Sequence, residues 1–375
     1  MTQNVKKVFV PKPDLPPPAS SVGVIGWMRE NLFSSWINSL FTLAALAVLL
    51  WMLPPILSWG LFNANWIGED RTVCDANPAG ACWVFVERRF LQIMFGLYYG
   101  GHPGEVWRPA LTFAILIGLA SMLFVPRFRY KLPLALFIIL VFPFFAFGMI
   151  HGEWFGFPVA KTSQWGGFML TFILASVGIT AALPIGIILA LGRRSNMPVI
   201  RAICVVFIEF WRGVPLITVL FMASNMLPLF FPADMDFDKV ARALIGITLF
   251  QSAYTAEAIR GGLQAIPSGQ FEAADALGMR YWKKTGLIIL PQALKISIPG
   301  IVNTFIALFK DTSLVAIIGL LDLLNMSQAA SRSFEWKGYD LEAYIFAASI
   351  FFICCFSMSR YSQSLERKLD TGHKR

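Results

Sequence analysis

The chain has 375 residues, of which 57% are hydrophobic and only 14% are charged. A soluble domain carries roughly 25% charged residues, so the composition excludes an ordinary soluble protein. The formal net charge of +9 comes from Lys and Arg residues scattered over polar stretches between apolar runs. Because these charges form no continuous basic face, nucleic acid is not an expected partner.

Long apolar runs follow one another along the chain. Several approach or exceed the roughly 20 residues that a helix needs to cross a bilayer. Backbone groups in lipid must be paired internally, and runs this long and this rich in Leu, Ile and Phe favour helices over barrel strands. We therefore predict an all-α polytopic membrane protein with about eight transmembrane helices, at residues 37–59, 110–126, 132–150, 166–191, 211–231, 240–262, 296–320 and 341–359.

The distribution of Lys and Arg predicts the orientation of these spans. When the connecting segments are assigned to alternating sides, most of the 31 basic residues fall on the side that holds both termini. Since cytoplasmic loops carry an excess of Lys and Arg, both termini are expected to be cytoplasmic.

The first third of the chain would be an N-terminal tail followed by three spans. Residues 1–36 begin with a polar, Pro-rich stretch and no apparent cleavable signal peptide, which predicts a disordered cytoplasmic tail. Residues 37–160 would hold three additional transmembrane helices, with a large periplasmic segment at about 60–109. Within that segment, residues 90–99 look amphipathic and are expected at the membrane surface.

Two of the five cysteines fall in the predicted outer segment. Cys74 and Cys82 are separated by a stretch with Pro and Gly that allows a tight return of the chain. An oxidising outer compartment would favour a disulfide between them, but two free thiols fit the sequence equally well.

Residues 161–365 would hold five spans and a polar insert, the cytoplasmic loop at about 263–295, before a short cytoplasmic tail at 366–375. In this insert, Ser268 is expected to be the N-cap of a helix, and Glu272 would lie near the positive end of that helix. Gly278 suits the left-handed residue that ends such a helix.

Enzyme activity is not expected of this chain. A P-loop for ATP needs Gly-Lys-Ser/Thr, and no Gly-Lys dipeptide occurs in the sequence. The three histidines are far apart and suit no metal site, and no nucleophile–base pair stands out.

Ionisable residues inside spans are costly and are therefore functional candidates. Glu209 and Arg212 lie three residues apart on one helical face, either as a structural pair or as part of an inner gate. The sixth span has its own group of polar residues, namely Gln251, Tyr254, Thr255, Glu257 and Arg260. Of these, Glu257 and Arg260 are spaced to pair.

The polar face of the sixth span would either line a substrate path or form hydrogen bonds between helices. In the seventh span, Asn303 and Lys310 stack two turns apart on one side. The adjacent Lys310 and Asp311 would either neutralise each other in a break of the helix or contact substrate.

The polar insert resembles the cytoplasmic coupling loop of ABC importer permeases. The pattern consists of Glu272-Ala273-Ala274, three residues, Gly278, nine residues, Ile288, one residue, and Leu290-Pro291. Further segments are similar to the polar amino acid branch of that family, among them Glu209-Phe210-Trp211-Arg212-Gly213-Val214-Pro215, Ala256-Glu257-Ala258-Ile259-Arg260-Gly261-Gly262 and Phe309-Lys310-Asp311-Thr312-Ser313. The three additional spans resemble the M-type permeases of general L-amino acid or glutamate/glutamine/aspartate/asparagine transporters.

The resemblance implies a type I ABC importer permease core in the last five spans, within a bacterial inner membrane. It implies a second permease subunit, identical or different, an ABC ATPase dimer that binds ATP and Mg, and a periplasmic amino acid-binding protein. Glu272, Ala273, Ala274, Gly278, Leu290 and Pro291 would form the site that couples to the ATPase. We hypothesise that Lys310 and Glu257 bind the two charged ends of an amino acid. The alternatives are an ion-coupled secondary transporter and an ABC permease for another small solute.

Overall fold

The computed structural model describes residues 23–125, 128–232 and 238–369, and the remaining parts of both predicted tails lie outside these ranges. Within the described ranges the chain forms helices and no β-strand. The predicted all-α class is therefore confirmed. The described residues divide into two units, the smaller formed by 23–66 with 72–81 and the larger by 67–71 with the described residues from 82 to 369.

The smaller unit contains one long apolar helix. Its elements are α1 (Gly23–Asn31), α2 (Trp36–Leu57), a π-helical turn (Ser58–Phe62) and α3 (Thr72–Ala76). The Ser35 side chain accepts a hydrogen bond from the Asn38 N–H at 3.2 Å and so begins α2. The segment from Trp36 to Phe62 has a mean hydropathy of 2.3 and no buried residue within the unit, as expected for a helix surrounded by lipid.

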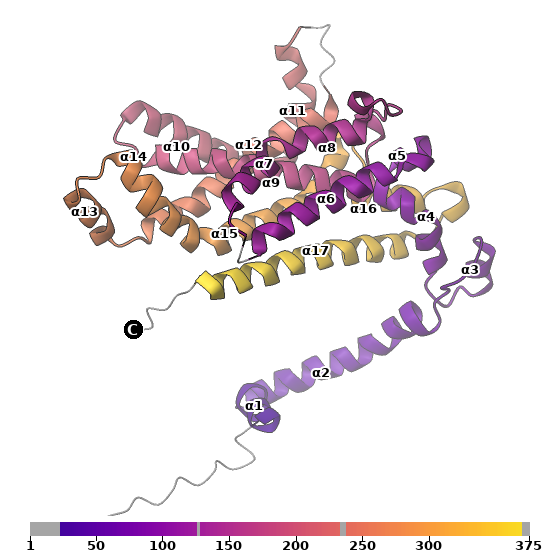
Figure 1. Ribbon diagram of the computed structural model, residues 1–375. Coiled ribbons are helices and arrows are strands. Elements are labelled where there is room, and N and C mark those ends of the chain that lie inside the picture. The colour runs from indigo at the N-terminus through magenta and orange to yellow at the C-terminus, as the bar shows by residue number, and fades with distance from the viewer. Residues whose placement is uncertain (1–22, 126–127, 233–237, 370–375) are drawn as a thin grey trace, which may run out of the picture. The chain divides into compact units, whose positions relative to one another are not determined.

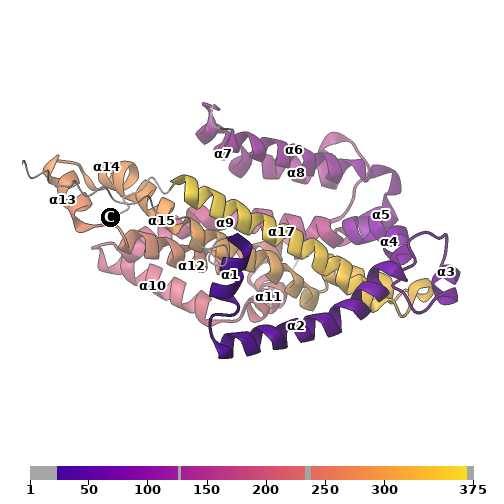
Figure 2. The same cartoon turned by 90° about the horizontal axis from the view of Figure 1, so that it is seen from below.

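The larger unit holds the other helices, drawn in Figure 1. They are α4 (Trp83–Phe95), α5 (Leu97–Gly101), α6 (Trp107–Phe124), α7 (Lys131–Leu140), α8 (Phe142–His151), α9 (Gly167–Arg193), α10 (Pro198–Gly213), α11 (Leu216–Asn225), α12 (Lys239–Gln264), α13 (Ser268–Ala276), α14 (Tyr281–Lys284), α15 (Leu290–Asp311), α16 (Leu323–Ser331) and α17 (Asp340–Leu369). In this unit α13 and α14 lie at one end of the bundle and α4 and α16 at the other, as Figures 1 and 2 both show.

The number of predicted spans is only partly confirmed. In the described chain, five helical segments are long and apolar enough to cross a membrane: Trp36–Phe62, Pro103–Leu123, Gly167–Arg193, Tyr281–Ile318 and Asp340–Leu369. Two further pairs, α7 with α8 and α10 with α11, are long and apolar enough to cross a membrane only when each pair is counted as one segment. The two helices of these pairs are bent relative to each other by 42° and 103°. Helix α12 matches the predicted span at 240–262 but is not one of these long apolar segments, so the count of eight is not confirmed.

The segment predicted as a span at 211–231 is not one continuous helix. The structure instead has α10, which ends at Gly213, and α11, which begins only at Leu216. Val214 is extended because the residue before a proline is disfavoured in the helical region, and Pro215 cannot donate a backbone hydrogen bond. Apolar composition alone could not show this break.

The outer segment also differs from the prediction of a surface helix at 90–99. Helix α4 begins earlier, at Trp83, and the chain turns at Gly96 before α5. Phe85 is fully buried, with its ring 5.8 Å from that of Trp336, and the N–H of Cys82 donates to Glu342 Oε1 at 3.0 Å. The start of α4 therefore packs on the first turn of α17 and on the 3-10 helix Phe334–Trp336 before it.

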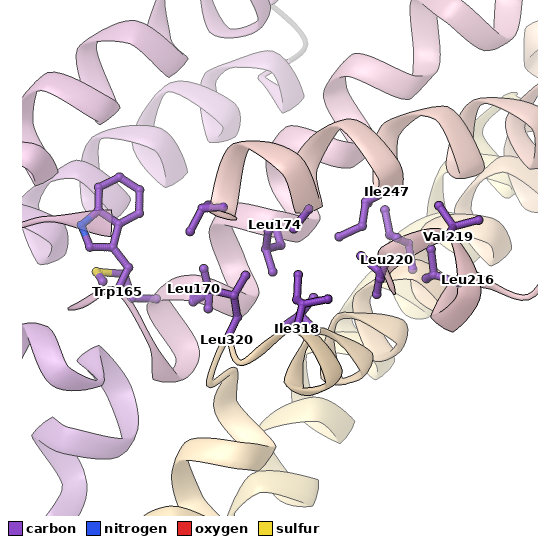
Figure 3. Close-up of a cluster of buried hydrophobic side chains, with 14 of the residues drawn as sticks. Trp165, Leu170, Leu174, Leu216, Val219, Leu220, Ile247, Ile318 and Leu320 are labelled. Carbon is purple, nitrogen blue, oxygen red and sulfur yellow. The ribbon is translucent and has the colours of Figure 1, made fainter. Parts of the chain in front are cut away.

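A buried apolar cluster fills the half of the bundle away from α13. It joins α9, α11, α12 and the 3-10 helix Thr312–Ile318, and Figure 3 shows its side chains converging between them. Beside the cluster, Asp322 begins α16 by accepting hydrogen bonds from the N–H groups of Leu324 and Asn325 at 3.2 and 3.1 Å. Burial raises the pKa of this carboxyl group, although those hydrogen bonds oppose the shift.

Helices α12 and α15 make a close backbone contact. A Cβ atom added at Gly262 would approach Ser297 Oγ to 2.0 Å and the Ala293 carbonyl oxygen to 2.4 Å, whereas one added at Gly261 would meet nothing within 4 Å. The absence of a side chain at Gly262 thus permits the two backbones to approach.

This contact yields a prediction with a control at the adjacent residue. Gly262→Val forces α12 and α15 apart and should lower the free energy of unfolding by about 1–3 kcal/mol. Gly261→Val should leave it unchanged or slightly raised, because Val is the better helix former in open space. Thermal unfolding of the purified variants measures the difference, and equal unfolding temperatures would contradict this account of the contact.

Candidate functional site

The polar insert folds as a helix, a tight turn and a return into α15. Helix α13 ends in a Schellman motif. The N–H of Met279 donates to the carbonyl oxygen of Ala274 at 3.2 Å, and the N–H of Gly278 donates to the carbonyl oxygen of Asp275 at 2.9 Å. Gly278 has φ of +69°, so its predicted left-handed conformation is confirmed.

The predicted start of this helix is wrong by one residue. Ser268 is the first helical residue, and Pro267 occupies the N-cap position with φ of −58° and ψ of 140°. The Pro267 carbonyl accepts from the Gln270 N–H at 3.1 Å and begins the helical hydrogen bonds. Because a proline already fixes φ near the required value, the helix starts without a side-chain cap.

Two polar contacts connect α13 with the chain that follows it. Lys284 Nζ lies 2.6 Å from Asp275 Oδ1. Gln292 Nε2, in the first turn of α15, donates to Gln270 Oε1 at 3.2 Å. These four residues were not identified from the sequence. The opposite charges of Asp275 and Lys284, on either side of the turn at Gly278, could have predicted their ion pair.

An apolar anchor holds the insert against the bundle. Ile266, Phe271, Ile288 and Ile289 pack with buried residues of α9, α10 and α12. The insert is therefore continuous with the core, and its orientation is fixed by packing as well as by polar contacts.

The residues of the coupling pattern divide between two faces. Glu272, Ala273, Gly278 and Pro291 are exposed, and Leu290 is half-buried. Ala274 is only 1% exposed and faces the bundle, so it cannot contact a separate subunit in this conformation. Leu277 and Trp282, which are 78% and 76% exposed, extend the free surface of the insert instead.

A group of charged side chains lies beside this anchor. Glu257 Oε1 accepts from Arg260 Nε at 2.9 Å, and Glu257 Oε2 lies 3.5 Å from Arg193 Nη1 and 3.7 Å from Arg212 Nη1. Arg193 Nη1 also contacts Glu209 Oε1 at 2.9 Å. These ion pairs join α9, α10 and α12 around one carboxylate.

The structure corrects the proposed pairing of Glu209 with Arg212. Glu209 pairs with Arg193, whereas Arg212 pairs with Glu257 and lies over the Tyr254 ring, 5.7 Å from its centroid. Spacing on one helix could not reveal Arg193, which comes from the end of α9. The expected pair of Glu257 and Arg260 is present.

The polar residues of the sixth and seventh predicted spans differ in burial. Gln251 is buried and donates to Thr304 Oγ1 at 3.0 Å, which joins α12 to the antiparallel α15. Asn303 and Lys310 are exposed, and α15 ends at Asp311, where the backbone changes to a 3-10 helix.

This register argues against a shared substrate contact of Glu257 and Lys310. Each lies six residues from the Gln251–Thr304 contact, in opposite directions along the bundle. At 1.5 Å per residue their positions are about 18 Å apart along the helix axes. One carbon separates the ammonium and carboxylate groups of an α-amino acid, so a single molecule cannot bridge this distance.

The cysteines differ in redox form. Cys74 and Cys82 are both disulfide-bonded, whereas Cys204, Cys354 and Cys355 are free.

The comparisons with known proteins identify the class. The model of the family described as binding-protein-dependent transport system inner membrane component matches residues 182–371, which include the charged group, the polar insert and α15. The chain belongs to this family.

Two relatives resemble the chain over nearly its whole length. It is 52% identical to the inner membrane amino-acid ABC transporter permease protein YhdY of Escherichia coli, covering 98% of both chains. It is 42% identical to the glutamate/glutamine/aspartate/asparagine transport system permease protein BztC of Rhodobacter capsulatus, covering 96% of both. Among solved structures, an amino acid ABC transporter described with histidines aligns at 31% identity and a TM-score of 0.48, covering 54% of this chain and 92% of that one.

The charged group yields a prediction about stability. Glu257→Gln leaves Arg193, Arg212 and Arg260 facing one another and should lower the free energy of unfolding by about 2 kcal/mol, less than the loss of a fully buried pair. Glu209→Gln removes one contact of a side chain that is 54% exposed, and its effect should stay below about 1 kcal/mol. Thermal unfolding at low and high salt measures both, and a larger loss for Glu209→Gln would contradict the central role of Glu257.

Proposed function

We propose that the chain is the permease subunit of an ATP-driven, binding-protein-dependent importer of L-amino acids. The observation that carries this proposal is the 52% identity, over 98% of both chains, to a protein named as an amino-acid ABC transporter permease. The name of the second relative, which includes glutamate, glutamine, aspartate and asparagine, favours polar amino acids as substrates.

The proposed assembly contains a second permease subunit, an ABC ATPase dimer and a periplasmic amino acid-binding protein in a bacterial inner membrane. Both termini would be cytoplasmic, and residues 161–365 would form the transport core. ATP and Mg would be bound by the ATPase, because the chain contains no Gly-Lys dipeptide for a P-loop of its own.

In this assembly the exposed face of the polar insert docks on the ATPase. Glu272, Ala273 and Gly278 lie on that face, and the exposed Leu277 and Trp282 add apolar area to it. A helix that docks in a groove typically presents such anchors on one side. The anchored side, with Ala274 and Phe271, then passes the movement of the ATPase to the bundle.

For the substrate path we retain Gln251, Tyr254, Asn303, Lys310 and Asp311. Lys310 is exposed near the end of α15 that lies away from the polar insert, where it could attract the carboxylate of an arriving amino acid. Glu257 is better suited to an inner gate, since three arginines already surround its carboxylate.

Reconstitution tests the proposed function. Vesicles that contain the permease pair and its ATPase should accumulate labelled L-glutamate, L-glutamine, L-aspartate or L-asparagine only when the binding protein and ATP are both supplied. A panel of the remaining labelled amino acids defines the range. ATP-independent uptake driven by an ion gradient would contradict the proposal and favour a secondary transporter.

The turn at Gly278 provides a test of coupling. An alanine at φ of +69° is strained by about 1 kcal/mol or more, so Gly278→Ala should tilt α13 and lower uptake per ATP hydrolysed about threefold. Gly269→Ala, in the same helix and in open space, should leave that ratio unchanged. The ratio is measured in the same vesicles from labelled substrate and released phosphate, and equal ratios for the two variants would count against the role of the turn.

A further inference from the structure

Arg194 contacts three helices at the junction of the polar insert with the bundle. It follows the last residue of α9, and its Nη1 donates to the carbonyl oxygen of Leu263 at 2.8 Å. The centre of its guanidinium group lies 5.4 Å from the centroid of the Phe271 ring. Leu263 is the penultimate residue of α12, and Phe271 belongs to α13.

The chemistry of the junction suits arginine in particular. The last carbonyls of a helix have no intrahelical partner and carry partial negative charge, so a cation that donates to the Leu263 carbonyl is stabilised. A planar guanidinium can lie over an aromatic ring while its edge donates a hydrogen bond. A lysine ammonium retains the charge but offers no plane that stacks on Phe271.

Apart from the contact with Arg194, the polar contacts of α13 described above are made with α14 and α15, which follow it in the chain. Asp275 contacts Lys284, and Gln270 accepts from Gln292. Arg194 adds a connection to α9, which runs the length of the bundle. At the far end of α9, the N–H of Gly167 donates to the Leu321 carbonyl at 2.8 Å, so α9 joins the insert to the opposite end of the unit.

We propose that Arg194 is a positioning residue that transmits displacement of α13 to α9, so that α9 and α15 move together when the insert moves. This inference rests on the proposed function, because it takes the ATPase as the source of the movement. Phe271 is the partner through which α13 acts on Arg194, and Leu263 ties the same guanidinium to α12.

The test compares three substitutions in vesicles with ATPase, binding protein and ATP. Arg194→Gln should lower the uptake of labelled L-amino acids per ATP hydrolysed about fivefold, at the lower end of typical coupling between sites. Arg194→Lys retains the charge at the Leu263 carbonyl and should give an intermediate ratio. Arg201→Gln removes an exposed arginine from α10 and should leave the ratio unchanged.

A structural role alone would lower the amount of assembled transporter without changing the ratio, and that result would overturn the inference. An unchanged ratio in Arg194→Gln at full assembly would do the same. Failure of the proposed function is distinguishable, because the unsubstituted transporter would then show no ATP-dependent uptake at all.

A distance measurement keeps the inference testable if Arg194→Gln does not assemble well. Spin labels at Asn196→Cys and Ser268→Cys, with the free cysteines replaced by alanine, report the separation of the end of α9 from α13. With arginine at position 194 this distance should be the same in the nucleotide-free and the ATP-trapped transporter. With glutamine it should differ or broaden between the two states. A distance that changes between states even with arginine present would overturn the inference.

Discussion

The close packing of α12 between α9 and α15 is the constraint on which the rest of the larger unit depends. Gly262 allows the backbone of α12 to approach Ala293 and Ser297, and the Gln251–Thr304 hydrogen bond fixes the register of the same pair. The two ends of this packed group of helices differ in the residues that they carry. One end holds the charged group and the polar insert, and the other holds the apolar cluster beside the start of α16.

The polar insert is thus an extension of the bundle rather than a free loop. Apolar contacts hold Phe271 and Ile289 against the core, while the opposite face of α13 is left exposed. A segment with one packed and one free face is suited to accept a force from a separate protein. Glu257 of α12 is paired with Arg193 at the end of α9 and with Arg212 of α10, so a shift of α9 or α10 would change this pairing.

Much of this arrangement was predictable from local sequence. The αL conformation of Gly278 followed from its position after a short helix, and apolar composition predicted the helical class. Features that depend on the meeting of distant segments were not predictable. Glu209 pairs with Arg193 of α9 and not with Arg212 of its own helix. Ala274 is buried against the bundle although it belongs to the coupling pattern. Helix ends set by proline were also misplaced, because apolar runs continue through the break at Pro215.

The family assignment, the exposed face of α13 and the anchoring of the insert together support the proposed ATPase contact at the end of the bundle that carries α13. A photo-crosslinking amino acid introduced at Glu272 tests this claim most directly. The matched control site is Phe334, which is 98% exposed and lies in the same 3-10 helix as Trp336, the residue that packs on Phe85 of α4. The account predicts an adduct with the ATPase from position 272 and none from position 334. Crosslinking to the ATPase from position 334, or its absence at position 272 in an assembled and active transporter, would contradict it.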